Sequence, residues 1–199
     1  MKAITLDGFE RTFAADPDPW QTFHNHDEVV KRRAILRALG PGPWGRVLEL
    51  AAGNGSNSAA IARRALRLDA TEATAAGTKL VADVLTGQPR ARAIRLSVPG
   101  RLPRTTYDAV VIAELLYYLS FKAMAQTAHD VARVLRPGGT LVLAHHRIDF
   151  HDFAQHAAPL HRRFLQATGR DWRVRNVQRN RCWTVIACTL ANPLAEPMV

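Results

Sequence analysis

The sequence has few cysteines, few aromatic residues and no long apolar run. Its 199 residues include two cysteines and 7% aromatic residues, although 47% are hydrophobic. No apolar run approaches the roughly 20 residues of a membrane helix, so we expect no membrane association. The first ten residues lack the basic segment and apolar core of a secretory signal, which favours a cytoplasmic location. This length and composition predict one folded domain over residues 1–199.

The scarcity of cysteine also argues against a disulfide or a metal centre. Cys182 and Cys188 are six positions apart in a strand-like segment. At roughly 3.3 Å per residue, a strand would hold them about 20 Å apart. A disulfide requires Cα atoms within about 7 Å. The sequence has no CxxC pair, so no metal site is expected.

Basic residues outnumber acidic residues, giving a net charge of +10 and a pI of about 10.7. Such a charge attracts phosphates and other anions. However, the basic residues are spread along the chain and do not form a Lys/Arg tail. A small-molecule partner is therefore favoured, and nucleic acid remains the less favoured alternative.

The most informative motif is VLELAAGNGS at residues 47–56, an apolar strand that leads through a glycine-containing turn into a helix. Glycine lets the backbone approach a nucleotide-like ligand closely. Glu72 follows at the end of the next apolar segment. A glycine turn with a downstream carboxylate is how Rossmann-like folds hold an adenosine, the carboxylate binding the ribose hydroxyls. Asp69 is the alternative residue for that role.

Helical and strand patterns alternate along the chain, which predicts an α/β fold. We expect a Rossmann-like, doubly wound, mostly parallel seven-stranded sheet with a C-terminal antiparallel hairpin. An irregular, lid-like segment (1–25) and a leading helix (26–40) would precede the binding core (45–190). The expected helices lie at 28–39, 58–66, 75–85, 121–135 and 159–168, and the strands at 47–50, 68–72, 91–97, 107–113, 140–144, 172–178 and 182–190.

Four pieces of the chain together resemble the class I S-adenosylmethionine (SAM) dependent methyltransferases. They are the segment 47–55, the acidic Glu72, the strand 107–111, and Leu-Arg-Pro-Gly-Gly-Thr-Leu at 135–141. A narrower resemblance is to the NodS-like N-methyltransferases. The segment Ala-Glu-Leu-Leu-Tyr-Tyr-Leu at 113–119 and Asp-Pro-Trp at 18–20 carry it.

The resemblance implies that SAM is the cofactor and that it binds at the carboxyl ends of the parallel strands. The residues implied in cofactor binding are Glu49, Ala51, Gly53, Gly55, Glu72, Ser97, Val98, Ala113 and Glu114. Two of them depart from the usual pattern. Ala51 replaces the first glycine, which is tolerable if its φ stays negative. Ser97 stands where an acidic residue often contacts the adenine.

The resemblance further implies methyl transfer to an amine nitrogen of a small polar acceptor, such as an amino sugar. An amine must lose its proton before it can attack, and histidine is suited to accept that proton. His146 is the preferred base, and His145 and His161 are alternatives. Tyr117 would offer a hydroxyl and an aromatic wall to the acceptor. The alternative functions are an RNA or protein methyltransferase, or a SAM-binding protein without catalysis.

Overall fold

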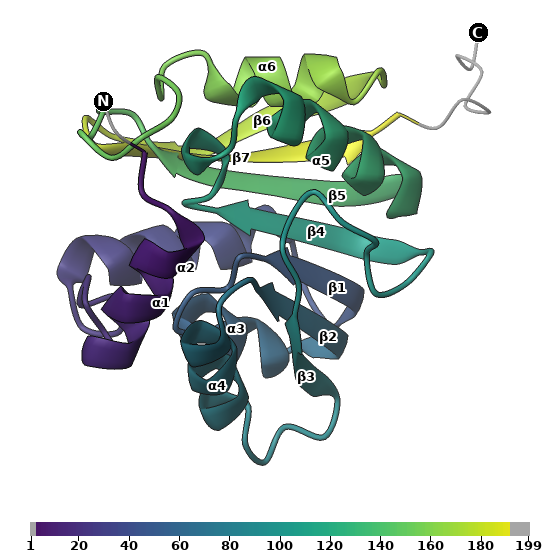
Figure 1. Ribbon diagram of the computed structural model, residues 1–199. Helices are drawn as coiled ribbons and strands as arrows, with labels where there is room; N and C mark the ends of the chain where they lie inside the picture. Colours follow the sequence, from purple (N-terminus) through teal and green to yellow (C-terminus); the bar gives the residue numbers. More distant parts are fainter. Residues whose placement is uncertain (1–2, 192–199) are drawn as a thin grey trace, which may run out of the picture.

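A computed structural model describes residues 3–191, which form a single seven-stranded sheet with helices on both faces (Figure 1). The helices are α1 (Leu6–Ala15), α2 (His26–Ala38), α3 (Ser56–Ala62), α4 (Ala75–Val84), α5 (Phe121–Val134) and α6 (Leu160–Ala167), with a short 3-10 helix η1 (Leu116–Tyr118). The strands are β1 (Trp44–Leu50), β2 (Ala65–Glu72), β3 (Ala91–Arg95), β4 (Tyr107–Ala113), β5 (Leu135–His146), β6 (Trp172–Arg179) and β7 (Trp183–Leu190).

The strand order is β3-β2-β1-β4-β5-β7-β6. Neighbours from β3 to β5 pair in parallel, whereas β7 pairs antiparallel with both β5 and β6. This confirms the predicted Rossmann-like sheet and its C-terminal hairpin. From β1 the strands are added on one side up to β3 and then on the other side from β4, so the strand order reverses between β1 and β4. In such sheets the ligand crevice lies beyond the carboxyl ends of the strands at this reversal.

Alternating side chains divide the core between the two faces of the sheet, as the period of two in a strand requires. Val47, Val111 and Val142 pack with α2, α3 and α4, while their neighbours Leu48 and Ile112 pack with α5 and α6. The central strands are apolar on both sides because helices cover both faces. The sheet is therefore a rigid platform whose strand ends hold the loops described below.

The structure differs from the sequence predictions at several element boundaries. The segment 1–25, expected to be irregular, contains α1, whose N-cap Thr5 accepts a hydrogen bond from the backbone of Gly8. The N-cap of α2 is Asn25, so the helix begins at His26, two residues before the expected start at 28. Strand β5 begins at Leu135, and the Pro-Gly-Gly turn forms an irregularity in its pairing with β4. Local helix capping and the bulge in β5 account for these three differences.

None of the helices in residues 3–191 combines the length and apolar character of a membrane span. The longest of them, α5, has 14 residues and is amphipathic, with one buried face against the sheet.

A buried carboxylate ties three segments together below the strand ends. Asp69 of β2 is 2% exposed and accepts hydrogen bonds from Arg92 (2.6 Å), Arg104 (2.9 Å) and the hydroxyl of Tyr107 (2.7 Å). Burial alone would raise the pKa of Asp69, but the contacts with Arg92 and Tyr107 outweigh it and hold the pKa below its usual 3.8. Asp69 thus links β2 to β3, β4 and the loop between them.

Replacing this carboxylate should destabilise the fold without touching the strand-end loops. We expect Asp69→Asn to lower the free energy of unfolding by about 1.5–3 kcal/mol, the usual range for hydrogen bonds to a charged group. Because the folded-state pKa is depressed, the contribution is complete above the unfolded pKa and is lost as pH falls through the folded value. Urea unfolding at pH 7 and pH 3 measures this, with exposed Asp83→Asn as control. An equal loss at both pH values would contradict it.

Candidate active site

A cavity of about 550 Å³ opens at the carboxyl ends of the parallel strands, and we call it the strand-end cavity. Most of the residues predicted to bind the cofactor or the acceptor line it: Ala51, Gly53, Glu72, Ser97, Val98, Ala113, Glu114, Tyr117 and His146. Four predicted residues do not line it: Glu49, Gly55, His145 and the alternative base His161. Register explains the convergence, because β1 and β4 end side by side, as do β4 and β5.

Glu72 fixes the glycine turn that forms one wall of the cavity. Its carboxylate accepts hydrogen bonds from the backbone N–H of Gly53 (3.1 Å) and from the N–H and hydroxyl of Thr74 (3.0 and 2.9 Å). The side chain is 6% exposed and faces the cavity. Asp69 lies three residues earlier in β2 and is engaged elsewhere, so of the two candidate carboxylates in β2 it is Glu72 that reaches this cavity.

The two glycines of the turn have different tasks. Gly53 has φ +62°, and a Cβ there would meet only a ring atom of Phe13, at 3.6 Å, so the backbone lies open toward the cavity. Gly55 has φ +82°, and a Cβ there would lie 2.5 Å from Val84. Gly55 therefore permits close packing of the turn on α4, and Gly53 leaves space for a ligand.

Ala51 adopts φ +53°, which corrects the prediction that its φ would be negative. This left-handed conformation costs a residue with a Cβ about 1–2 kcal/mol. Ala52 follows and donates its N–H to the carbonyl of Thr71, which locks the turn onto β2. The turn geometry is therefore kept although the glycine is absent, and the strain is held in the wall of the cavity.

Glu49 supports the turn from behind. It is 1% exposed and accepts a hydrogen bond from the hydroxyl of Ser58 in α3. Burial raises the pKa of Glu49 to about 7, although the contact with Ser58 opposes the rise. Its carboxylate thus anchors the start of α3, beneath the loop that lines the cavity.

A charged cluster occupies the opposite wall, beyond β4. The Glu114 carboxylate binds the Lys31 ammonium of α2 (2.7 Å) and accepts a hydrogen bond from the Tyr117 hydroxyl. Lys31 also binds Glu28 (2.7 Å). Burial opposes the charge on Lys31, but Glu114 and Glu28 raise its pKa above the usual 10.5. His146 completes the cluster, with Nε2 4.0 Å from a Glu114 oxygen.

The two adjacent histidines of β5 face opposite sides of the sheet. His145 is 1% exposed, and its Nε2 accepts the N–H groups of Leu115 (3.3 Å) and Leu116 (3.2 Å). Its Nδ1 lies 3.0 Å from Nε2 of His161. Burial, followed by neighbouring His161, lowers the pKa of His145 well below 6.5, and burial lowers that of His161 to about 4. His145 therefore shapes the loop after β4, while His146 faces the cavity.

Helix α1 covers the strand-end cavity, beside the arrowheads of the parallel strands in Figure 1. Phe9 contacts Tyr118 edge to face (5.0 Å between ring centroids), and Phe13 contacts Trp20 in the same way (5.4 Å). The Glu10 carboxylate accepts the first N–H groups of α4, 2.7 and 3.0 Å away. This placement suits the charge preference of a helix N-terminus and holds α1 over the cavity.

Sequence reasoning missed Lys31 and the lining residues of α1. Both left a signal in the spacing. Lys31 precedes Ala34 and Ile35 by three and four positions, which places it on the buried face of α2. Leu6, Phe9 and Phe13 recur at helical spacing after Thr5. The two Asp-Pro pairs at residues 16–19 disfavour a helix, and they led to the prediction of an irregular segment there.

Comparisons with known proteins agree with this geometry. Residues 47–139 match a family model described as a methyltransferase domain, and no curated protein matches the sequence significantly. Among solved structures, the chain is similar to the N-methyltransferase NodS from Bradyrhizobium japonicum WM9 in complex with S-adenosyl-L-homocysteine (SAH). That match has TM-score 0.78 and 19% identity and covers 94% of this chain and 98% of NodS.

Two further solved structures share the fold. A methyltransferase from Pseudomonas syringae has TM-score 0.71 and 21% identity and covers 83% of this chain and 99% of its own. A SAM-dependent methyltransferase from Leishmania major has TM-score 0.75 and 18% identity, and the match covers 93% of this chain and 80% of that one. Matches at these identities establish the fold.

The matched segment runs from β1 to the turn in β5 and so contains the glycine turn, Glu72 and Glu114. Residues 47–139 therefore form a methyltransferase domain, and the fold agrees with the predicted resemblance to class I methyltransferases and the NodS-like enzymes. SAM is the cofactor of this class. The strand-end cavity fits such a group, because Gly53 leaves its wall open and a buried carboxylate faces the space.

Restoring the missing glycine should relieve the strain at the turn. We expect Ala51→Gly to raise the free energy of unfolding by roughly 0.5–1 kcal/mol, since the left-handed cost exceeds the added flexibility of the unfolded chain. Denaturant unfolding measures the change. Ala52→Gly, in the same turn without a positive φ, should destabilise the protein, and equal effects of both variants would contradict the strain.

Glu72 should control cofactor affinity. We expect Glu72→Gln to weaken SAH binding by about tenfold or more, because a charge-assisted acceptor is replaced by a neutral one. Isothermal titration with SAH measures this, and Asp69→Asn serves as the matched control in the same strand. Unchanged SAH affinity in Glu72→Gln, or an equal loss of affinity in Asp69→Asn, would show that Glu72 does not bind the ribose.

Proposed function

We propose that this methyltransferase transfers a methyl group from SAM to an amine nitrogen of a small polar acceptor, an amino sugar being the favoured class. The proposal rests chiefly on the gap between His146 Nε2 and Glu114 Oε2. At 4.0 Å the two atoms are too far apart for a direct hydrogen bond. An amine nitrogen placed between them could contact both at ordinary hydrogen-bond distances of about 2.7–3.2 Å.

The neighbours of that gap suit an amine in both protonation states. The Glu114 carboxylate favours an incoming ammonium, and His146 accepts the proton at Nε2 so that the nitrogen lone pair is freed. Lys31 remains charged and forms an ion pair with Glu114 at 2.7 Å. Tyr117, held by Glu114 and stacked on Phe153 at 3.6 Å, provides a rigid wall.

When bound, SAM supplies an electrophilic methyl group on a sulfonium. In the proposal, Glu72 orients its ribose, and the open backbone at Gly53 gives it room. Ser97 and Val98 line the strand-end cavity beyond β3 and are proposed adenine neighbours. The aromatic faces of Tyr117 and Tyr118 would favour the cationic sulfonium. Helix α1, proposed as a lid, would exclude water from the reacting atoms.

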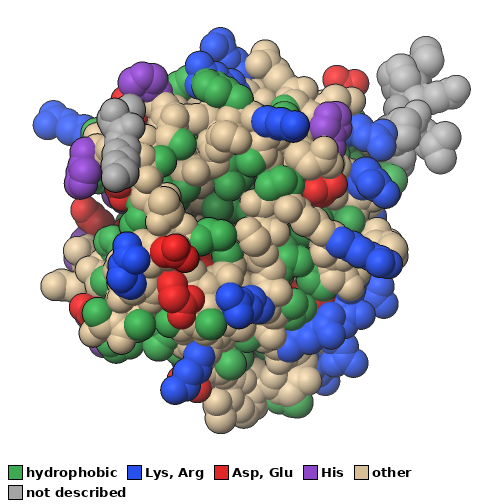
Figure 2. Space-filling view, in the orientation of Figure 1, with side chains coloured by type: hydrophobic (Ala, Val, Ile, Leu, Met, Phe, Trp, Pro, Cys, Tyr) green, Lys and Arg blue, Asp and Glu red, His purple; other side chains and the backbone are tan. Residues whose placement is uncertain are grey.

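Surface charge gives less support to an RNA acceptor. Figure 2 shows Lys and Arg side chains spread over the visible face, most densely at its lower right, and acidic side chains lie on the same face. Nucleic-acid binding usually concentrates basic residues in one patch or stripe. The small-molecule proposal is therefore preferred.

Loss of the proposed base should separate turnover from binding. We expect His146→Ala to lower kcat by about 10²–10⁴-fold, the usual contribution of general-base catalysis, with little change in SAH affinity. A labelled-methyl assay on amino sugars, amino acids and RNA, together with SAH titration, measures both. The exposed His129→Ala in α5 is the control. Equal losses of turnover and SAH affinity would remove His146 as base, and transfer to RNA alone would overturn the proposed acceptor.

A further inference from the structure

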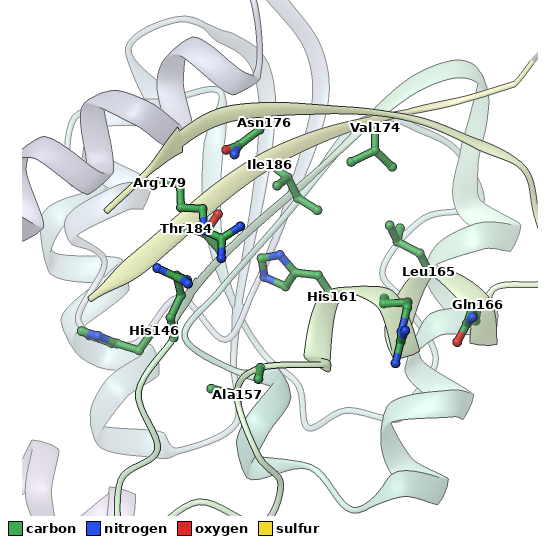
Figure 3. Close-up of a pocket in the computed structure, with 13 residues that line it drawn as sticks. His146, Ala157, His161, Leu165, Gln166, Val174, Asn176, Arg179, Thr184 and Ile186 are labelled. Carbon is green, nitrogen blue, oxygen red and sulfur yellow. The ribbon is translucent and has the colours of Figure 1, made fainter. Parts of the chain in front are cut away.

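A second cavity, of about 520 Å³, lies between α6 and the strand pair β6–β7, and we call it the hairpin cavity (Figure 3). Figure 3 shows His161 reaching from α6 toward the strands, with Val174 toward one end of the strand pair and Ile186 near its middle. Thr184 and Arg179 lie at the other end, nearer to His146. His146 lines both cavities, which therefore adjoin at this residue.

Three arginines, Arg147, Arg162 and Arg179, line the hairpin cavity, and no Asp or Glu lines it. Within residues 3–191, none of the three forms an ion pair. Arg147 donates to the carbonyl of Asn180, which holds it at the mouth of the hairpin. Guanidinium groups without a partner carboxylate favour phosphate and carboxylate, which they bind through paired hydrogen bonds.

The remaining lining suits an uncharged body attached to such an anion. Leu165, Val174 and Ile186 form an apolar floor, and Val174 is 51% exposed although it faces α6 across the cavity. Asn176 and Gln166 offer amide groups to hydroxyls at its edge. The volume lies within the roughly 300–1,000 Å³ of small-molecule sites.

We propose that the hairpin cavity binds an acidic group of the methyl acceptor, which is therefore an amine that also carries a phosphate or carboxylate. The inference rests on the proposed function and narrows its substrate class. The anion would lie among the arginines, the body on the apolar floor, and the amine at the gap between His146 and Glu114. Part of the protein's net positive charge would then help it to select a small anionic substrate.

Three amino sugars that differ only at C6 test the proposal: glucosamine, glucosamine 6-phosphate and 2-amino-2-deoxyglucuronate. Each is titrated into the SAH-saturated protein. We expect at least one acidic sugar to bind about tenfold tighter than glucosamine, and the preferred acid distinguishes phosphate from carboxylate. Arg162→Ala and Arg179→Ala should each weaken that binding by about tenfold or more, because each removes a charge-assisted contact. SAH affinity should stay unchanged.

Arg175→Ala is the matched control, since it removes the same charge from β6 at a position that does not line the cavity. Equal affinity for all three sugars would overturn the proposal, as would an equal effect of Arg175→Ala. A labelled-methyl assay separates this inference from the proposed function. Arginine-dependent binding without methyl transfer to any amine would contradict the proposed function, whereas transfer with the same KM in the arginine variants would contradict the inference.

Discussion

The site depends on one buried carboxylate that joins two strand ends. Glu72 is the last residue of β2, and its carboxylate accepts a hydrogen bond from the N–H of Gly53 in the turn after β1. This hydrogen bond fixes the position of the turn relative to the end of β2. Parallel pairing of β1 with β2 and β4 then brings the loop at Glu114 to the opposite wall. The Glu72 contact thus supports the strained turn at Ala51 together with the hydrogen bond from the Ala52 N–H to the Thr71 carbonyl.

Electrostatics give the two walls different characters. The Glu72 wall presents a carboxylate satisfied by neutral N–H and hydroxyl groups. The Glu114 wall contains a Lys31 ammonium between two carboxylates, which is stable because each charge is paired and hydrogen-bonded despite burial. In the proposed function the ribose lies at the Glu72 wall and the amine at the Glu114 wall. The cofactor and the acceptor would then bind side by side along the strand ends.

Much of this arrangement follows from sequence patterns, and the parts that do not have identifiable causes. The β-branched strand at 107–113 and the turn at 51–55 predicted the sheet and the placement of Glu72, because strand ends and turns have local signatures. Lys31 and α1 were missed because their roles arise from tertiary contacts. The sequence predicted the turn but not the positive φ of Ala51, because that φ is set by contacts of the turn, such as the hydrogen bond from Ala52 to Thr71, and not by the alanine itself.

A structure of the complex with SAH would place the ligand relative to both walls at once. We expect the ribose hydroxyls within hydrogen-bond distance of Glu72 and the sulfur directed at the space between Tyr117 and His146. An SAH molecule bound away from the strand ends, or one whose sulfur faces Ser97, would contradict the account.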